Sequence, residues 1–91
     1  MSGRHSVNVT IVNRLGLHAR PAMAFVDEAS KFKAEVRVSR DDQEVDGKSI
    51  MHMMLLAATK GTVLTIIAEG EDAPAACAAL KRLVDAGFDE E

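Results

Sequence analysis

A histidine and an arginine separated by one residue, His18 and Arg20, are the side chains of this sequence best suited to chemistry. Gly16 permits a sharp turn before them, and Pro21 suits the first turn of a helix, because its missing N–H is no loss there. His18 is therefore expected at a helix start or one residue before it. Free backbone N–H groups and the positive end of the helix dipole point outward at that place. A nucleophilic imidazole, a guanidinium and a helix N-terminus together could hold a phosphoryl group.

The electrostatics of a helix start favour such a use of His18. The helix dipole disfavours an imidazolium and favours an anion, each by ~0.3–1 kcal/mol at an exposed site. Phosphoryl transfer asks mainly for positioning and charge stabilisation, which the backbone N–H groups of Ala19, Arg20 and Ala22 and the Arg20 side chain are predicted to supply. The local pattern alone leaves an alternative open, in which His18 is merely a turn residue and Arg20 a solvated side chain.

A second candidate segment is Gly47-Lys48-Ser49, which looks like the end of a phosphate-binding loop. A Walker A loop needs a glycine five positions before Gly47, where this chain has Asp42, and a preceding buried parallel strand is also lacking. Nucleotide binding is therefore excluded. Ser49 is predicted to cap a short helix, and a phosphate there would be tolerated because a helix N-terminus accepts anions.

The short helix predicted after Ser49 is unusually apolar. It contains too many apolar residues for one face of two helical turns: Ile50, Met51, Met53, Met54, Leu55 and Leu56. Exposed methionine and isoleucine would form a docking surface that accommodates several partners. From the pattern alone, a fully buried short helix explains the same residues equally well.

Composition narrows the class of protein. The chain has 91 residues, 47% of them hydrophobic, which predicts one small folded domain over residues 1–91. Its net charge of −3 argues against a surface that binds nucleic acid or an anionic membrane. No apolar run is long enough to span a membrane. Cys77 is the single cysteine and reads as a small core residue, which fits a reducing cytoplasm. His5, His18 and His52 have no ligand spacing, so neither a metal nor another cofactor is expected.

The periodicity of apolar residues predicts strand, helix, strand, strand, helix, strand, helix. Their expected ranges are 6–13, 19 to about 31, 34–39, 43–46, 50–56, 62–68 and, after a cap at Asp72, 73–86 with a stop at Gly87. One sheet with helices on one face, a two-layer sandwich, is the economical packing. The strand 62–68 should lie inside the sheet and the polar strand 43–46 at an edge, and a sheet with one bare face should be mainly antiparallel.

Two stretches resemble one known family. The segment from Asn13 to Ala22 resembles the active-site signature of HPr, the histidine-containing phosphocarrier of the bacterial sugar phosphotransferase system. Lys48-Ser49-Ile50-Met51, with the segments 61–63 and 68–72, resembles that family's second half. The resemblance implies an α+β open-faced β-sandwich with four antiparallel strands in the order 1-4-2-3 and three helices on one side. It implies a cytoplasmic monomeric carrier rather than an enzyme.

The resemblance also implies roles for residues and partners. Phosphorylated enzyme I, itself charged by phosphoenolpyruvate, would phosphorylate His18 at Nδ1. Arg20 would assist this transfer. A-type domains of sugar permeases would then accept the phosphoryl group. Ser49 matches a regulatory serine phosphorylated by an HPr kinase/phosphorylase. The docking surface would comprise Leu17, Ile50, Met51 and Met54.

His52 and the apolar run 53–58 depart from the residues expected in that helix. The departure leaves an alternative open: a mainly regulatory protein, nitrogen-related or acting in catabolite control. Such a protein would act through phosphorylated Ser49 and a transcriptional regulator, or through protein docking.

Overall fold

The computed structural model describes residues 3–90, so Met1, Ser2 and Glu91 of the predicted domain lie outside the described residues. The strands are β1 (Arg4–Thr10), β2 (Glu35–Arg40), β3 (Gln43–Asp46) and β4 (Val63–Glu69). The helices are α1 (Ala19–Ala29), α2 (Ile50–Leu55), α3 (Ala73–Asp85) and a final 3-10 turn, η1 (Gly87–Asp89). The order of elements is the predicted one.

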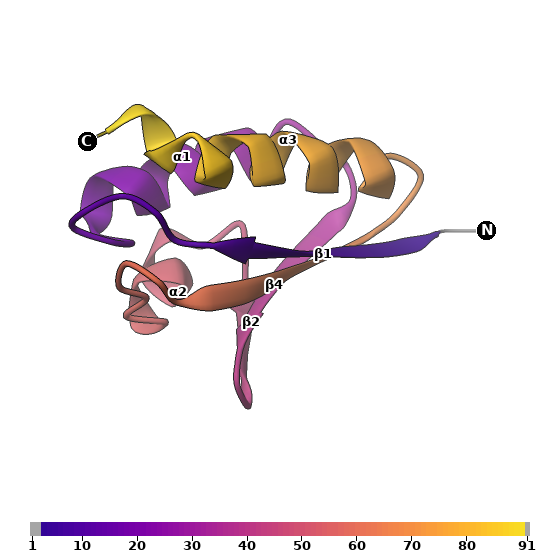
Figure 1. Cartoon of the computed structure of the whole chain (residues 1–91). Helices are drawn as coiled ribbons and strands as arrows, with labels where there is room; N and C mark the ends of the chain where they lie inside the picture. Colours follow the sequence, from indigo (N-terminus) through magenta and orange to yellow (C-terminus); the bar gives the residue numbers. More distant parts are fainter. Residues whose placement is uncertain (1–2, 91) are drawn as a thin grey trace.

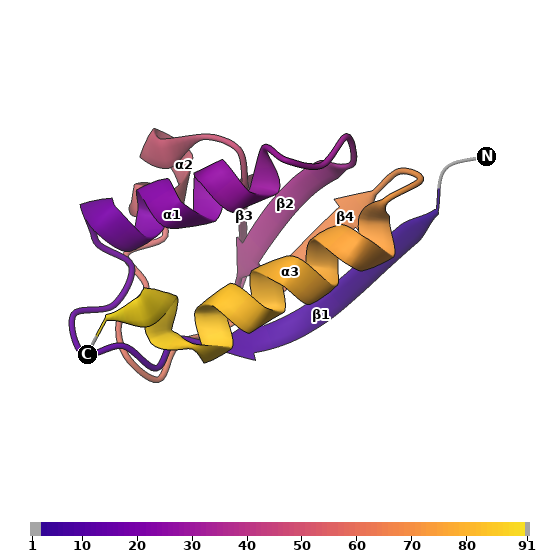
Figure 2. The same cartoon turned by 90° about the horizontal axis from the view of Figure 1, so that it is seen from above.

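The four strands form one antiparallel sheet in the order β1-β4-β2-β3. The most apolar strand, β4, is central and the polar β3 is at an edge, so both placements are confirmed. Helices α1 and α3 lie over one face of the sheet (Figures 1 and 2), and α2 packs against α1 and β3. Within residues 3–90 the opposite face carries no helix, which gives the open-faced sandwich that the resemblance implied.

Alternation of side chains along the strands builds the core. In β4 the side chains of Leu64, Ile66 and Ala68 are buried, whereas their neighbours along the strand are exposed or half-buried. Phe25 of α1 packs into the same core, and full burial of each large apolar side chain contributes roughly 1.5–3 kcal/mol. Cys77 of α3 is buried, and that burial raises the pKa of its thiol. The interpretation of Cys77 as a core residue is confirmed.

Asp72 does not cap α3 in the predicted way. It occupies the N-cap position, but its side chain makes no capping hydrogen bond. Its two carboxylate oxygens instead accept hydrogen bonds from the backbone N–H groups of Lys33 and Ala34, each at 2.8 Å. The Lys33 hydrogen bond is the largest cause that holds the pKa of this carboxyl below its usual range. Asp72 thus ties the start of α3 to the connection between α1 and β2.

The loop between β1 and α1 is packed tightly on the segment that precedes β4. Strand β1 ends at Thr10, before the predicted Asn13, although the Ile11 N–H still donates to the Thr62 carbonyl at 2.9 Å. Gly16 has a φ of +73°, and a Cβ added to it would lie 2.5 Å from the Ala58 carbonyl oxygen. The backbone of the loop therefore touches the backbone of residues 58 and 59, and only glycine fits at this contact.

Replacing Gly16 by alanine should destabilise the protein by more than about 2 kcal/mol, because left-handed strain and a backbone clash add. Gly61→Ala is the matched control, since Gly61 also has a positive φ (+93°) but has nothing within 4 Å of an added Cβ. Strain alone should cost Gly61→Ala about 1–2 kcal/mol. Urea unfolding measures both, and equal losses in the two variants would show that the close approach at Gly16 contributes nothing.

Candidate functional site

His18 is the N-cap residue of α1, as predicted. Its backbone is extended (φ −84°, ψ −168°), its N–H donates to the Gly16 carbonyl and its carbonyl accepts from the Ala22 N–H, both at 3.0 Å. The imidazole does not cap the helix, and 38% of the side chain is exposed. The ring is therefore fixed at the N-terminus of α1 while one side of it can meet another molecule.

The first turn of α1 leaves two backbone N–H groups unused. Within residues 3–90, neither the Ala19 N–H nor the Arg20 N–H has a hydrogen-bond acceptor, and Pro21 has no N–H to offer. The Ala22 N–H is used by the His18 carbonyl, so the prediction that it binds phosphate is wrong. Ala19 and Arg20 supply the free donors beside His18.

A carboxylate from the other end of the chain contacts the imidazole. The Glu90 Oε1 lies 3.1 Å from the His18 Nε2 and 3.1 Å from the Asn13 Nδ2. The same Asn13 amide nitrogen donates to the Gly16 carbonyl at 2.7 Å, and Asn13 is only 2% exposed. The Nε2 is thus the ring nitrogen that faces Glu90. The His18 Nδ1 has no partner among the described residues.

The backbone at the end of the chain turns sharply to bring Glu90 to this place. The three residues Gly87, Phe88 and Asp89 have φ values of 65°, 57° and 60°. This left-handed conformation costs about 1–2 kcal/mol of folding free energy for each of the two residues that are not glycine. Burial of the Phe88 side chain, 7% exposed, offsets this with roughly 1.5–3 kcal/mol. Figure 2 shows the C-terminal end beside the loop that follows β1.

Arg20 is exposed on the first turn of α1. Its guanidinium makes no hydrogen bond or ion pair to any other residue in the range 3–90. The structure thus places Arg20 beside His18 along the helix start without joining the two side chains. A solvated guanidinium two residues from the imidazole can bind an anion held at His18.

Ser49 caps α2, as predicted. Its Oγ accepts the His52 N–H at 3.2 Å, and the His52 Nδ1 accepts the Asp46 N–H at 3.3 Å. At the other end of α2 the Arg40 guanidinium donates to the Leu56 carbonyl at 2.7 Å. The short helix is therefore held at both ends, and His52 ties it to the end of β3.

Helix α2 exposes most of its apolar side chains. We call the exposed set the α2 surface: Ile50 (38% exposed), Met51 (78%), Met54 (45%) and Leu55 (64%). Met53 faces the core and is fully buried. Because the other four side chains are exposed, the alternative of an entirely buried helix is wrong. Leu17 is 5% exposed and cannot present its side chain to a partner, which removes it from the predicted docking residues. The α2 surface lies on the helix that packs against α1.

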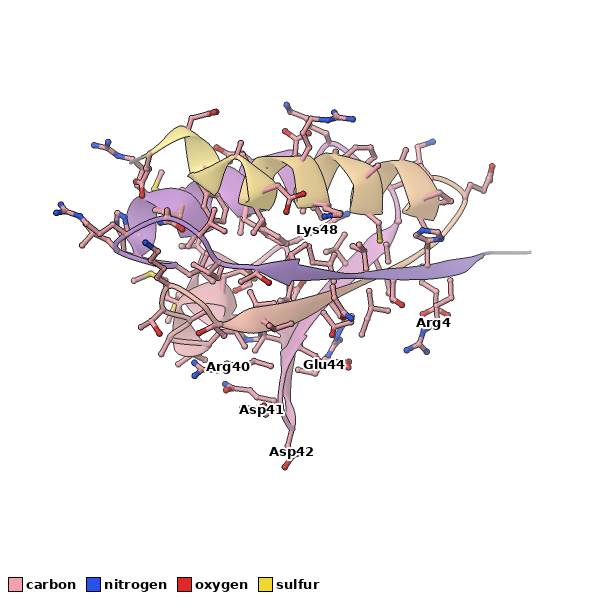
Figure 3. All side chains as sticks on the ribbon, in the orientation of Figure 1. Arg4, Arg40, Asp41, Asp42, Glu44 and Lys48 are labelled. Carbon is pink, nitrogen blue, oxygen red and sulfur yellow. The ribbon has the colours of Figure 1, made fainter. Side chains whose placement is uncertain are left out.

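The segment around Gly47 connects β3 to α2. Asp42 lies at the tip of the β2–β3 hairpin, far from Lys48 (Figure 3). The Lys48 ammonium donates to the Phe32 carbonyl at 2.7 Å, so it supports the fold. Across residues 3–90 no three metal-binding side chains cluster, and none of the helices is long and apolar enough to cross a membrane.

Sequence reasoning did not single out Glu90 or the side chain of Asn13. The only sequence signals were an acidic residue after the predicted helix stop at Gly87 and an apolar Phe88 between them. An apolar residue after a helix stop indicates that the chain folds back onto the core. It does not indicate where on the core the next side chain will lie.

The sequence of this chain matches those of known proteins. Residues 5–86 match the family model described as "PTS HPr component phosphorylation site". The chain is 49% identical over 86 residues to phosphocarrier protein HPr of Pseudomonas aeruginosa, and the matched region covers 93% of this chain and 96% of that protein. It is 40% identical over 82 residues to phosphocarrier protein NPr of Shewanella violacea, and the matched region covers 90% of each chain.

The structures agree as well. A crystal structure of HPr from Thermoanaerobacter tengcongensis superposes with a TM-score of 0.92, at 44% identity, covering 96% of this chain and 98% of that one. The sheet order, the histidine at the N-cap of α1 and the family model thus point to one conclusion. This chain belongs to the HPr family of phosphocarrier proteins of the phosphotransferase system.

Proposed function

We propose that the Nδ1 of His18 accepts a phosphoryl group from one protein and passes it to another. The observation that carries this proposal is the imidazole at the N-terminus of α1, with Nε2 beside Glu90 and Nδ1 left open. Family membership supports it. The chain is on this account a stoichiometric carrier with a transient phosphohistidine, without catalytic turnover of its own.

The chemistry needs little beyond positioning. The lone pair on Nδ1 attacks phosphorus, a nitrogen–phosphorus bond forms, and the bond to the donor's leaving atom breaks with its electron pair going to the donor. The free N–H groups of Ala19 and Arg20 and the Arg20 guanidinium meet the transferred oxygens. The dipole of α1 adds ~0.3–1 kcal/mol in favour of the bound dianion.

The partners proposed for the chain are those that its family resemblance implies. The donor is phosphorylated enzyme I, charged by phosphoenolpyruvate, and the acceptors are A-type domains of sugar permeases. The α2 surface (Ile50, Met51, Met54 and Leu55) supplies exposed apolar side chains for docking. Its methionines are flexible and polarisable, which suits a surface that must accept more than one partner.

A second candidate function is regulation through Ser49. The side chain is half-buried at the N-cap of α2, next to the α2 surface. The chain is also 41% identical, with a TM-score of 0.72, to a solved structure of Crh, the Bacillus subtilis catabolite repression HPr, which favours a regulatory role. A kinase of the HPr kinase/phosphorylase type would phosphorylate Ser49, and the product would bind a transcriptional regulator. The two functions are compatible, because His18 and Ser49 are separate side chains on different helices.

Incubation with phosphoenolpyruvate and enzyme I tests the carrier function. The wild-type protein should gain an acid-labile, base-stable phosphate, and His18→Ala should gain none, because the nucleophile is gone. His5→Ala is the matched control, since it removes an exposed histidine on β1 and should be labelled like the wild type. Absence of label in the wild type, or label retained in His18→Ala, would contradict the proposal.

Arg20→Ala should slow transfer from enzyme I by about 10- to 100-fold, since a hydrogen bond to a charged group contributes roughly 1.5–3 kcal/mol. Its melting temperature should stay near that of the wild type, because the Arg20 side chain makes no hydrogen bond or ion pair within residues 3–90. Arg82→Ala, which removes an exposed arginine on α3, should not change the rate. Loss of folding in Arg20→Ala would instead identify Arg20 as structural.

Ser49→Asp should weaken binding to enzyme I about tenfold, since a charge beside Ile50 and Met51 must be desolvated on docking at a cost of ~1–3 kcal/mol. Ser6→Asp places the same charge on β1 and should bind like the wild type. Calorimetric titration measures the affinities. Equal affinity of Ser49→Asp and wild type would contradict the placement of the docking surface at α2.

A further inference from the structure

We propose that Arg40 is a positioning residue for the docking of partners. By binding carbonyls at the end of α2, it holds Ala57 in a strained backbone conformation. It thereby fixes the α2 surface relative to the loop that presents His18, so that a partner in contact with both meets a pre-formed surface. This inference rests on the proposed carrier function and assigns it a residue of the β2–β3 hairpin, outside the site described above.

Arg40 is the last residue of β2, and its half-buried side chain reaches the end of α2. The guanidinium Nη1 donates to the Leu56 carbonyl at 2.7 Å and to the Ala57 carbonyl at 3.1 Å. Figure 3 shows Arg40 at the lower end of β2, below α2. Among residues 3–90 the guanidinium has no carboxylate partner. Its charge is therefore directed at carbonyls that the end of a helix leaves unsatisfied.

Ala57 has a backbone conformation that an alanine avoids. Its φ is +49°, in the left-handed region that is unfavourable for any residue with a Cβ. The Ala57 side chain is exposed, so its own burial does not offset the strain. Such a conformation persists only where the surroundings hold it. The Ala57 N–H donates to the Met54 carbonyl at 3.1 Å, and Arg40 holds the residue from its carbonyl side.

The residue after Ala57 is bonded to the loop that presents His18. The Ala58 carbonyl accepts the Leu17 N–H at 2.8 Å, and Ala58 is 3% exposed. Leu17 directly precedes His18. The chain from the α2 surface to this contact therefore passes through one left-handed residue. A change of φ at Ala57 would turn α2 relative to the loop.

The relation between α2 and the loop matters because one partner has to contact both. Helix α2 packs against α1, whose N-cap is His18, so a protein that reaches the imidazole also meets the α2 surface. A surface held in its bound conformation loses less freedom on binding. If Arg40 only stabilised the fold, its loss would lower the melting temperature but leave the affinity of the folded protein unchanged.

The test compares the wild type with Arg40→Ala, Arg40→Lys, Ala57→Gly and the double variant Arg40→Ala/Ala57→Gly. Arg37→Ala is the matched control, since Arg37 lies on the same strand but pairs with Glu44 at 3.1 Å. The first readout is hydrogen exchange of the Leu17 amide, which reports local opening. The second is the KM and kcat for phosphorylation by enzyme I. The third is the rate with phosphoramidate, a small donor that needs no docking surface.

In Arg40→Ala the KM for enzyme I and the exchange rate of the Leu17 amide should each rise about tenfold, since hydrogen bonds from a charged donor are lost. The kcat and the phosphoramidate rate should keep their wild-type values, because His18 and the donors at the start of α1 are unchanged. The Ile11 amide, bonded to the Thr62 carbonyl, should exchange as in the wild type.

The double variant should recover most of the KM and of the Leu17 exchange rate, because glycine adopts a left-handed backbone without strain. Ala57→Gly alone should behave like the wild type, and so should Arg37→Ala. Arg40→Lys should lose only part of the affinity, since an ammonium can still donate to a carbonyl but lacks the planar fork of a guanidinium. Arg40→Lys also gives the comparison if Arg40→Ala does not fold.

Equal KM and equal Leu17 exchange in the wild type and Arg40→Ala would overturn the role of Arg40 while leaving the carrier function intact. A parallel fall of kcat and of the phosphoramidate rate, or no recovery in the double variant, would overturn it as well. Failure of the wild type to take up a phosphoryl group at His18 from either donor would instead refute the carrier function. The exchange of the Leu17 amide is independent of that function and would still decide whether Arg40 holds α2 to the loop.

Discussion

The contact of the Gly16 backbone with the backbone of residues 58 and 59 is the constraint on which the rest of the site depends. A side chain at Gly16 would collide with the Ala58 carbonyl, and the Leu17 N–H donates to that same carbonyl at 2.8 Å. The loop between β1 and α1 is thereby laid on the segment between α2 and β4. His18 emerges from this contact with an extended backbone, so α1 begins at the next residue.

Two segments far apart in the sequence contribute to the setting of His18. The loop after β1 supplies Asn13 and the imidazole itself, and the turn after α3 supplies Glu90. Buried Phe88 holds that turn in a left-handed conformation that an unsupported chain would leave. The helix start supplies donors for an anion, whereas the carboxylate lies on the opposite nitrogen of the ring. The positive end of the α1 dipole and the negative carboxylate of Glu90 therefore act on different sides of the His18 imidazole.

Much of this arrangement could be predicted from the sequence because it is local. Gly16, Pro21 and the apolar spacing from Ala22 to Ala29 predict a helix that starts at His18, and the β-branched run before Ala68 predicts the central strand. The Ala22 N–H was wrongly assigned to phosphate because an N-terminal N–H is free only if no carbonyl lies one turn before it. Glu90 was missed because its partner is 72 residues away, and no local pattern encodes such a contact.

The central claim is that His18 carries a phosphoryl group on Nδ1 while Nε2 keeps its proton. Long-range proton–nitrogen correlation spectra of the protein, labelled with 15N-histidine and phosphorylated by enzyme I, test this directly. The account predicts that the phosphorus is bonded to the Nδ1 of His18 and that the proton resides on Nε2. Phosphorus bonded to Nε2, or to a residue other than His18, would contradict it.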